Sequence, residues 1–282
     1  MYLKAYAKIN LALNVVNKRK DGFHNLDMIV LPLKLHDTIA VSRISKKQTS
    51  HILINDEVPN FPNNICENLI KDINDKFRIK KKYEFAIYKE IPMQAGLGGG
   101  SSDAATIYRF YDKKFKLNMP GIIALNFLKQ YGSDIPFFVI NKPARIKGIG
   151  DLIEPIQIKK DYYVLIVKPR QGLDTKEVYQ ALNKTKFKVC DIDSVVKALA
   201  IGDDELLAKS IGNSLEAPAI KKCPKIKEIK DYLIGSGFPI TLMTGAGSAV
   251  FSLSTDKDKV KQMVNNLKKL NYQAFYTTIL KE

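Results

Sequence analysis

The stretch PMQAGLGGGSSDAAT, residues 92–106, contains four glycines and two serines within seven consecutive positions. It follows a strand-like alternation of Tyr83, Phe85 and Ile87 and leads into a helical pattern. Because glycine loses more backbone freedom on folding than any other residue, so many glycines in one place need a reason. A strand, a glycine-rich turn and a helix N-terminus form an arrangement that binds phosphate, since free backbone N–H groups and the positive end of the helix dipole point at the anion.

Two serines follow the glycines at the expected start of the helix. We expect Ser101 and Ser102 at the N-cap, and either hydroxyl can also reach a phosphate or its Mg²⁺. Asp103 either reaches the metal ion or favours the helix start, and we expect the second. The chain has no Gly-Lys pair, which excludes the Walker loop, and Ser101 interrupts the dinucleotide fingerprint GxGxxG. A tight strand–helix turn and an anion cradle of another type remain, and the glycines together with the serine pair favour the cradle.

Further periodic patterns place this motif in a chain of mixed strands and helices. Period-2 alternation and apolar runs predict strands at 2–16, 28–35, 38–44, 51–54, 83–91, 137–147, 162–168, 239–243, 249–254 and 273–280. Helical spacing predicts helices at 65–77, 104–115, 120–131, 174–183, 191–201, 203–211, 224–235 and 260–270. Strands and helices intermixed in two halves predict an α+β fold of two domains, residues 1–155 and 156–282.

The composition is that of a globular chain with a strongly basic balance. The 282 residues are 45% apolar and carry a net charge of +16. No run of about 18 apolar residues occurs, so we expect no membrane span. The three cysteines are scattered, which suits a reducing compartment and predicts a cytoplasmic protein. Only six of the 45 basic residues are arginine, so a solvated lysine-rich surface explains the charge better than a nucleic-acid footprint does.

The glycine-rich stretch resembles the second motif of the GHMP kinases, the superfamily of galactokinase, homoserine kinase, mevalonate kinase and phosphomevalonate kinase. Its Gly-Gly-Gly-Ser-Ser-Asp-Ala-Ala form is similar to the branch that phosphorylates 4-diphosphocytidyl-2-C-methyl-D-erythritol. Four other stretches agree with this branch in order and spacing: AYAKINLALNV at 5–15, DGFHNL at 21–26, GSDIPFF at 132–138 and TGAGSAVF at 244–251. The resemblance implies a ribosomal-protein-like N-terminal domain, a ferredoxin-like C-terminal domain and an active site in the cleft.

The resemblance also implies a catalytic pair. Lys8 and Asn10 lie two apart on a predicted strand and so share a face, about 6.6 Å apart, where a lysine is ordinarily just solvated. Asp134 by itself fits a turn before a buried strand. In the family, the aspartate of GSDIPFF is the proposed catalytic base, the lysine is its ion-pair partner, and the asparagine lies on the substrate side.

For ATP, the resemblance implies binding by the glycine-rich stretch, with Mg²⁺ at Ser101 and Ser102. The implied nucleotide-binding residues are Pro92, Met93, Gln94, Ala95, Gly96, Leu97, Gly98, Gly99, Gly100, Ser101 and Ser102. Three further positions match family residues near the adenine base, namely Asn64, Ile65 and Lys89.

For the acceptor, the resemblance implies contacts from Asn10, Phe23, His24, Thr175, Tyr179 and Gly245. His24 would contact the cytosine, beside Phe23, where the family usually has tyrosine. Thr175 and Tyr179 stand four residues apart, which puts both on one face of a short helix. The TGAGSAVF segment, which contains Gly245, is expected to fold toward the first glycine-rich loop and to help shape the active site.

The residues alone predict a phosphate-binding enzyme. The resemblance implies an ATP- and Mg²⁺-dependent kinase for the 2-hydroxyl of 4-diphosphocytidyl-2-C-methyl-D-erythritol. We expect a small-molecule substrate, no nucleic-acid or membrane partner, and a monomer or weak homodimer. One alternative is a kinase of the same superfamily for homoserine, mevalonate or a related alcohol. The other is a basic RNA-binding protein, which would bind RNA tightly with strong salt dependence.

Overall fold

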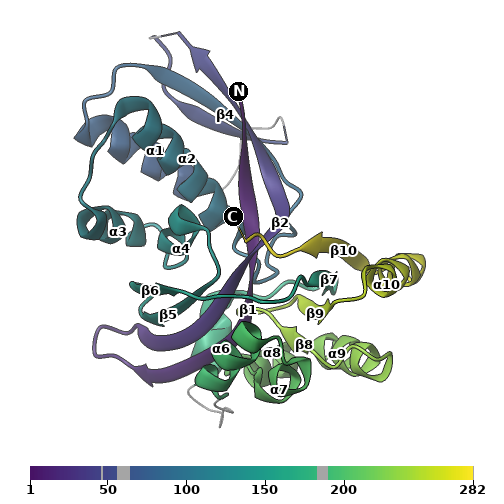
Figure 1. The fold of residues 1–282 in the computed structure, drawn as a ribbon. Coiled ribbons are helices and arrows are strands. Elements are labelled where there is room, and N and C mark those ends of the chain that lie inside the picture. The colour runs from purple at the N-terminus through teal and green to yellow at the C-terminus, as the bar shows by residue number, and fades with distance from the viewer. Residues whose placement is uncertain (46, 56–63, 183–189, 282) are drawn as a thin grey trace. The chain divides into compact units, whose positions relative to one another are not determined.

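The computed structural model describes residues 1–45, 47–55, 64–182 and 190–281 (Figure 1). The chain forms two compact units that interleave along the sequence. Unit 1 comprises Met1–Ala7, Leu35–Ile91 and Gly98–Asn141, and unit 2 comprises Lys8–Lys34, Pro92–Leu97 and Lys142–Glu282. The division falls inside two long strands, β1 (Tyr2–Lys18) and β2 (His24–Ile44). The domain boundary at residue 155 stays a prediction. It was drawn from the order of the sequence motifs, whereas the two units are defined by contacts in the structure.

Unit 1 combines the second half of β2 with two further strands and a group of helices, of which α1 contacts β3. Strands β3 (His51–Ile54) and β4 (Lys82–Tyr88) pair in parallel, and β4 pairs antiparallel with β2. The helices are α1 (Ile65–Lys76), α2 (Gly99–Phe115), α3 (Gly121–Lys129) and α4 (Ile135–Ile140). Figure 1 shows α1 and α2 side by side, and α2 also contacts α4.

Aromatic side chains join β4 to α2 in the core of unit 1. The Tyr83 and Phe110 ring centroids lie 5.1 Å apart, and those of Phe85 and Phe110 lie 5.6 Å apart, both edge-to-face. Tyr111 is fully buried beside them. Such pairs bury large apolar area in a specific geometry. The packing therefore holds the strand before the glycine-rich motif and the helix after it in one rigid arrangement.

Unit 2 contains the first half of β2, which pairs with β5 (Ala144–Gly148), and β5 pairs with β6 (Leu152–Pro155). A second, antiparallel sheet has the order β10-β7-β9-β8. Its strands are β7 (Tyr163–Lys168), β8 (Thr241–Met243), β9 (Val250–Ser254) and β10 (Gln273–Thr278). The helices are α5 (Thr175–Leu182), α6 (Ile192–Ile201), α7 (Asp204–Ser210), α8 (Glu216–Lys222), α9 (Lys225–Gly235) and α10 (Lys257–Lys269).

The second sheet has the ferredoxin-like topology. Helix α9 contacts β8 and β9, and α10 contacts β7 and β10. Strand, helices, two strands, helix and strand follow in the β-α-β-β-α-β order of that fold. The ferredoxin-like C-terminal region expected from the resemblance is thus confirmed. The turn between β8 and β9 is the TGAGS segment.

Two predictions of secondary structure were wrong. The apolar run 137–147 was expected to be one strand, but α4 covers Ile135–Ile140 and β5 begins only at Ala144. Pro136 lies in the first turn of α4, where its fixed φ suits a helix. Phe137 and Phe138 are buried, so tertiary packing overrides the strand-like pattern. The strands expected at 28–35 and 38–44 are one continuous strand, β2.

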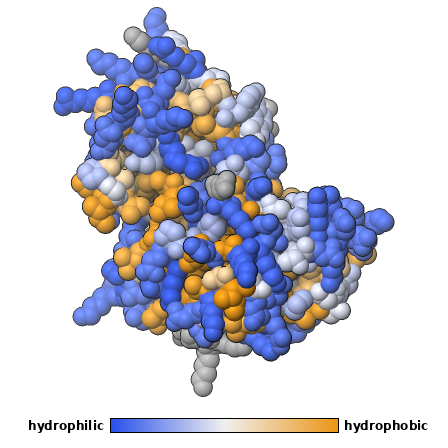
Figure 2. All heavy atoms as spheres, in the orientation of Figure 1, coloured by the Kyte–Doolittle hydropathy of each residue, from blue (hydrophilic) through white to orange (hydrophobic). Residues whose placement is uncertain are grey.

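No helix among the described residues is long and apolar enough to cross a membrane. Figure 2 shows hydrophilic side chains spread over most of the drawn face, with apolar side chains between them. This distribution fits the dispersed lysines of the sequence.

Candidate active site

The first half of the glycine-rich motif, residues 92–97 in unit 2, lies against the turn between β8 and β9. The amide of Ser248 donates to the carbonyl of Gln94 (3.4 Å), and the amide of Ala249 donates to that of Ala95 (3.3 Å). The Thr244 hydroxyl donates to the carbonyl of Gly96 (3.4 Å). The prediction that the TGAGSAVF segment folds toward the first glycine-rich loop is therefore confirmed.

Two glycines in this contact admit no side chain. Gly96 has a φ of +75°, and a Cβ built on it would lie 2.2 Å from the carbonyl oxygen of Thr244. Gly245 has a φ of +57°, and its Cβ would lie 3.0 Å from the carbonyl oxygen of Gly96. Left-handed backbone and close approach both demand glycine here. The two turns therefore contact each other through their main chains.

A third segment joins these turns and was not predicted from the sequence. The Ser248 hydroxyl donates to the carbonyl of Gln171 (2.6 Å). A Cβ on Gly172 would lie 2.4 Å from Oε1 of Gln94, so the Gln94 side chain covers this glycine. The sequence signal that could have indicated this contact is Gly172 in PRQGLDTKEVY, residues 169–179.

Lys8 and Asn10 are buried on β1, with 4% and 1% of their surfaces exposed. The Lys8 ammonium donates to Oδ1 of Asn10, so the two side chains share a face as predicted. The amide of Asn10 donates to the Thr244 hydroxyl (2.9 Å), and the amide of Lys8 donates to the carbonyl of Leu97 (3.0 Å). The ordinary interpretation of Lys8 as a solvated surface lysine is wrong, because the residue lies beneath both glycine turns of unit 2.

The second half of the motif belongs to unit 1 and starts helix α2 earlier than expected. The N-cap is Gly98 with a φ of 74°, so Ser101 and Ser102 lie inside the first turn and not at the N-cap. Glycine adopts this left-handed conformation without strain, which lets the helix begin at Gly99. The amide of Ser102 donates to the carbonyl of Gly98 (2.9 Å). No side chain of the described residues caps this helix.

The first turn of α2 fits an anion. Within the part of the chain that the structure describes, no side chain caps its first N–H groups, and the helix dipole favours negative charge there. A Cβ on Gly100 would meet no atom of the described residues within 4 Å, so this part of the turn faces open space. The geometry therefore suits a phosphate group that approaches the main chain closely.

The two serines differ in exposure. Ser102 is buried, with 1% of its surface exposed, whereas Ser101 is half-buried. A Cβ on Gly132 would lie 3.4 Å from Oγ of Ser101, so the start of the GSDIPFF segment approaches the first turn of α2. Asp134 is half-buried at the N-cap position of α4, but its carboxylate does not cap that helix.

Lys89 is held by two carboxylates. Its ammonium donates to Oδ2 of Asp37 and to Oδ2 of Asp103 (2.7 Å). Burial opposes protonation of Lys89, but Asp103 and Asp37 outweigh it and raise its pKa. Burial also raises the pKa of Asp103 to about 7, against the opposing effect of Lys89. Asp37 was missed by the sequence reasoning, which expected a break between strands at this position.

The other two residues expected near the adenine base start helix α1. Asn64 is the N-cap, and its Oδ1 accepts a hydrogen bond from the amide of Cys66 (2.9 Å). Ile65 is the first residue of the helix. A contact of either residue with a base stays a prediction.

His24 and Tyr179, both in unit 2, come together although they are far apart in the sequence. Their ring centroids lie 5.1 Å apart at an interplanar angle of 33°. Nε2 of His24 is buried without a hydrogen-bond partner among the described residues. Burial and then Lys18 lower the pKa of His24, which favours the neutral ring. Phe23 is 63% exposed, and Thr175 is exposed at the first position of α5.

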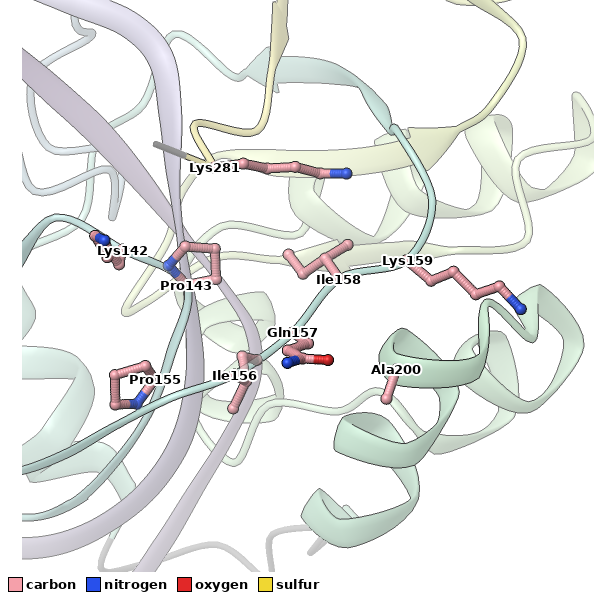
Figure 3. Close-up of a pocket in the computed structure, with 9 residues that line it drawn as sticks. All are labelled: Lys142, Pro143, Pro155, Ile156, Gln157, Ile158, Lys159, Ala200 and Lys281. Atoms are coloured by element: carbon pink, nitrogen blue, oxygen red, sulfur yellow. The ribbon is translucent and has the colours of Figure 1, made fainter.

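A pocket of about 430 Å³ in unit 2 lies apart from these residues (Figure 3). Pro143, Pro155 and Ile156 supply apolar lining, and the lysines at its edges include Lys159 and Lys281. None of the site residues predicted from the sequence lines it. This pocket therefore does not belong to the candidate active site.

Two family models match the chain: the GHMP kinases N terminal domain over residues 60–142 and the GHMP kinases C terminal model over residues 195–273. A Streptococcus equi subsp. zooepidemicus protein named putative 4-diphosphocytidyl-2-C-methyl-D-erythritol kinase is 33% identical over 268 residues, 94% of each chain. A Caldicellulosiruptor bescii protein named 4-diphosphocytidyl-2-C-methyl-D-erythritol kinase is 31% identical over 279 residues, covering 99% of this chain and 98% of the relative.

A solved structure agrees with these relatives. The crystal structure of a 4-(cytidine 5'-diphospho)-2C-methyl-D-erythritol kinase superposes with a TM-score of 0.83 and 26% identity, over 100% of both chains. Family models in both parts of the chain, relatives matched over nearly the full length and a solved structure of the same fold all agree. The chain therefore belongs to the GHMP kinase family and is an ATP-dependent phosphotransferase.

Proposed function

We propose that this kinase transfers the γ-phosphoryl group of ATP to the 2-hydroxyl of 4-diphosphocytidyl-2-C-methyl-D-erythritol, in the non-mevalonate pathway of isoprenoid precursor synthesis. The observation that carries the proposal is the pair of His24 and Tyr179 rings, in which Nε2 of His24 is buried and has no hydrogen-bond partner among the described residues. A flat heteroaromatic base stacks on such rings and satisfies the ring nitrogen. Full-length relatives named as kinases of this compound support it.

The nucleotide is proposed to bind along the glycine-rich motif, with its phosphates at the first turn of α2. ATP supplies the phosphoryl group, and Mg²⁺ neutralises its charge. Among the described residues, no three His, Cys, Asp or Glu side chains gather as a metal site. This fits Mg²⁺ held mainly by phosphates and water, with few protein ligands. Ser101 is the better candidate ligand, because the Ser102 side chain is buried.

Asp134 is proposed as the general base for the acceptor hydroxyl and Lys8 as a cation that stabilises the charge developing in the transition state. The hydrogen bond from Lys8 to Asn10 supports this assignment, because it orients the ammonium on the buried face of β1. Asn10 and Gly245 are proposed to line the acceptor site, with Phe23 and Thr175 beside the cytosine pocket. We propose a cytoplasmic enzyme that uses small-molecule substrates only.

A coupled ADP-release assay tests the substrate. The cytidine diphosphate compound, mevalonate and homoserine are compared at equal concentrations with ATP and Mg²⁺. We expect turnover with the first compound alone, and the Asp134→Ala variant serves as the inactive control. That variant should lose a factor of about 10²–10⁴ in kcat while it still binds ATP. Turnover of mevalonate or homoserine above that of the cytidine compound would refute the proposal.

A further inference from the structure

Three buried charged side chains of unit 1 meet beside the glycine-rich motif. Asp37 on β2, Lys89 after β4 and Asp103 in α2 expose 0%, 13% and 5% of their side chains. Lys89 donates to both carboxylates. Charges this deeply buried persist in proteins only when they are paired and hydrogen-bonded, and removing one partner is strongly destabilising. We therefore expect Lys89 to stay paired with both carboxylates, while Oδ1 of Asp103 is buried without a hydrogen-bond partner among the described residues.

One carboxylate of the network holds the chain that leads into the motif. Oδ1 of Asp37 accepts hydrogen bonds from the amides of Glu90 (2.7 Å) and Ile91 (2.8 Å), the residues directly before Pro92. Oδ2 of the same carboxylate accepts from Lys89. Asp37 thus holds the main chain at Glu90 and Ile91 and the side chain of Lys89.

The other carboxylate holds the helix that follows the motif. Asp103 lies in the second turn of α2, and its Oδ2 accepts from Lys89. A Cβ on Gly99, the first residue of the helix, would lie 3.2 Å from the Lys89 ammonium nitrogen and 3.4 Å from Oδ2 of Asp37. The first turn of α2 therefore lies directly on the network.

We propose that Lys89 is a positioning residue that fixes residues 89–91 to residues 99–103 through Asp37 and Asp103, and thereby aims the main-chain N–H groups of Gly99, Gly100 and Ser101 at the phosphates of ATP. This inference rests on the proposed function in one respect, namely that the phosphates of ATP bind at the first turn of α2. It assigns the Lys89 ammonium a role in phosphate binding, whereas the resemblance implied only a position near the adenine base.

The geometry favours the phosphate end over the base. Two of the three ammonium protons of Lys89 are engaged by carboxylates, and its nitrogen lies beneath Gly99. A base contact would need this ammonium to turn away from two buried carboxylates, which is unfavourable. An effect on the phosphates requires only that the first turn of α2 stay where the network holds it.

The test measures nucleotide binding by calorimetry, with no acceptor substrate present. At pH 8, above the pKa of about 7 that burial gives Asp103, Asp103→Asn keeps the size and an acceptor atom but removes the charge on the helix side. We expect the Kd values of ATP, GTP and inorganic tripolyphosphate to rise together by about tenfold, as for the loss of one charge-assisted hydrogen bond. Glu205→Gln, which removes the charge from an exposed Lys209–Glu205 pair on α7, is the matched control and should leave all three unchanged.

A double variant provides a second test in case Asp103→Asn does not fold because Lys89 has lost the charge of one of its two buried partners. Lys89→Met with Asp103→Asn removes a cation and an anion together, and Asp37 keeps its two amide donors. We expect the double variant to be folded by circular dichroism and to bind all three ligands about as weakly as Asp103→Asn does. Equal loss in both variants indicates that the two residues act as one unit.

Two outcomes would overturn the proposal. One is Kd values within twofold of wild type in folded Asp103→Asn. The other is a loss in the double variant that affects ATP but not GTP or tripolyphosphate, which would return Lys89 to the base. Because no acceptor is used, failure of the proposed acceptor would appear separately, as absent turnover with intact nucleotide binding.

Discussion

The two halves of the glycine-rich motif use glycine for different reasons. Residues 92–97 lie against the β8–β9 turn, where a Cβ on Gly96 would lie 2.2 Å from a carbonyl oxygen. The turn that opens α2 has open space at Gly100 and a network of buried charges beneath Gly99. In the first half the fold itself excludes a side chain. In the second half, no atom of the described residues restricts a side chain at Gly100, and we propose that a bound phosphate is the reason for the glycine there.

The largest effect is expected at Gly96, where the fold demands glycine. Gly96→Ala introduces both a left-handed alanine and a clash with the Thr244 carbonyl. We expect a loss of about 3 kcal/mol or more in the free energy of unfolding, measured by urea denaturation. The control is Gly22→Ala, since Gly22 has a φ of +88° and no atom of the described residues within 4 Å of its Cβ.

The control separates strain from contact. Gly22→Ala should cost about 1–2 kcal/mol from the backbone conformation alone. If Gly96→Ala costs no more than Gly22→Ala, the contact between the two glycine turns contributes nothing, and the comparison between the halves of the motif fails.

A smaller and different effect is expected at Gly100, where ligand and fold can be separated. Gly100→Ala places a methyl group in open space at the helix start, so thermal stability should stay equal or rise, since alanine favours helix by about 1 kcal/mol. If phosphate approaches this main chain, the KM for ATP should rise about tenfold or more. Gly121→Ala, at the open first position of α3, is the matched control and should leave KM unchanged.

The test at Gly100 compares two measurements on one variant, the thermal stability and the KM for ATP. A stable Gly100→Ala enzyme with the KM of wild type would contradict the phosphate cradle. It would also show that both halves of the motif carry glycine for the fold alone.

Local patterns predicted the features of the site that depend on neighbouring residues. Short-range periodicity predicts the strand, glycine turn and helix around residues 92–106. It also predicts the shared face of Lys8 and Asn10 and the helical spacing of α5. The resemblance supplied the long-range pairing of the TGAGSAVF segment with the first loop. Periodicity alone contains no information on that contact, because the residues are about 150 positions apart.

Two of the three failures depended on partners distant in sequence, and the third depended on the conformation of one nearby glycine. The apolar run after Asp134 has the composition of a strand, and only its burial beside α2 makes residues 135–140 a helix. Serine is a preferred N-cap residue, but the left-handed conformation of Gly98, three residues before Ser101, starts α2 earlier. Asp37 lies in the middle of a long strand, and its role appears only when Lys89 and Asp103 are brought to it by the fold.

The smallest expected effect is a pH dependence of stability at the ring pair of unit 2, which differs from the network of unit 1 because its ionisable group, His24, is favoured in the neutral form. Burial lowers the pKa of His24, so the folded protein binds this proton less tightly than the unfolded chain does. Its contribution to stability is therefore present above the unfolded pKa of about 6.5 and is lost as pH falls through the folded value. Between pH 7.5 and pH 5, wild type should lose slightly more thermal stability than His24→Gln, because other titrating groups cancel in the comparison. Parallel pH profiles for the two proteins would mean that the imidazole can be protonated freely beside Tyr179, which would remove the argument for a neutral, base-stacking ring.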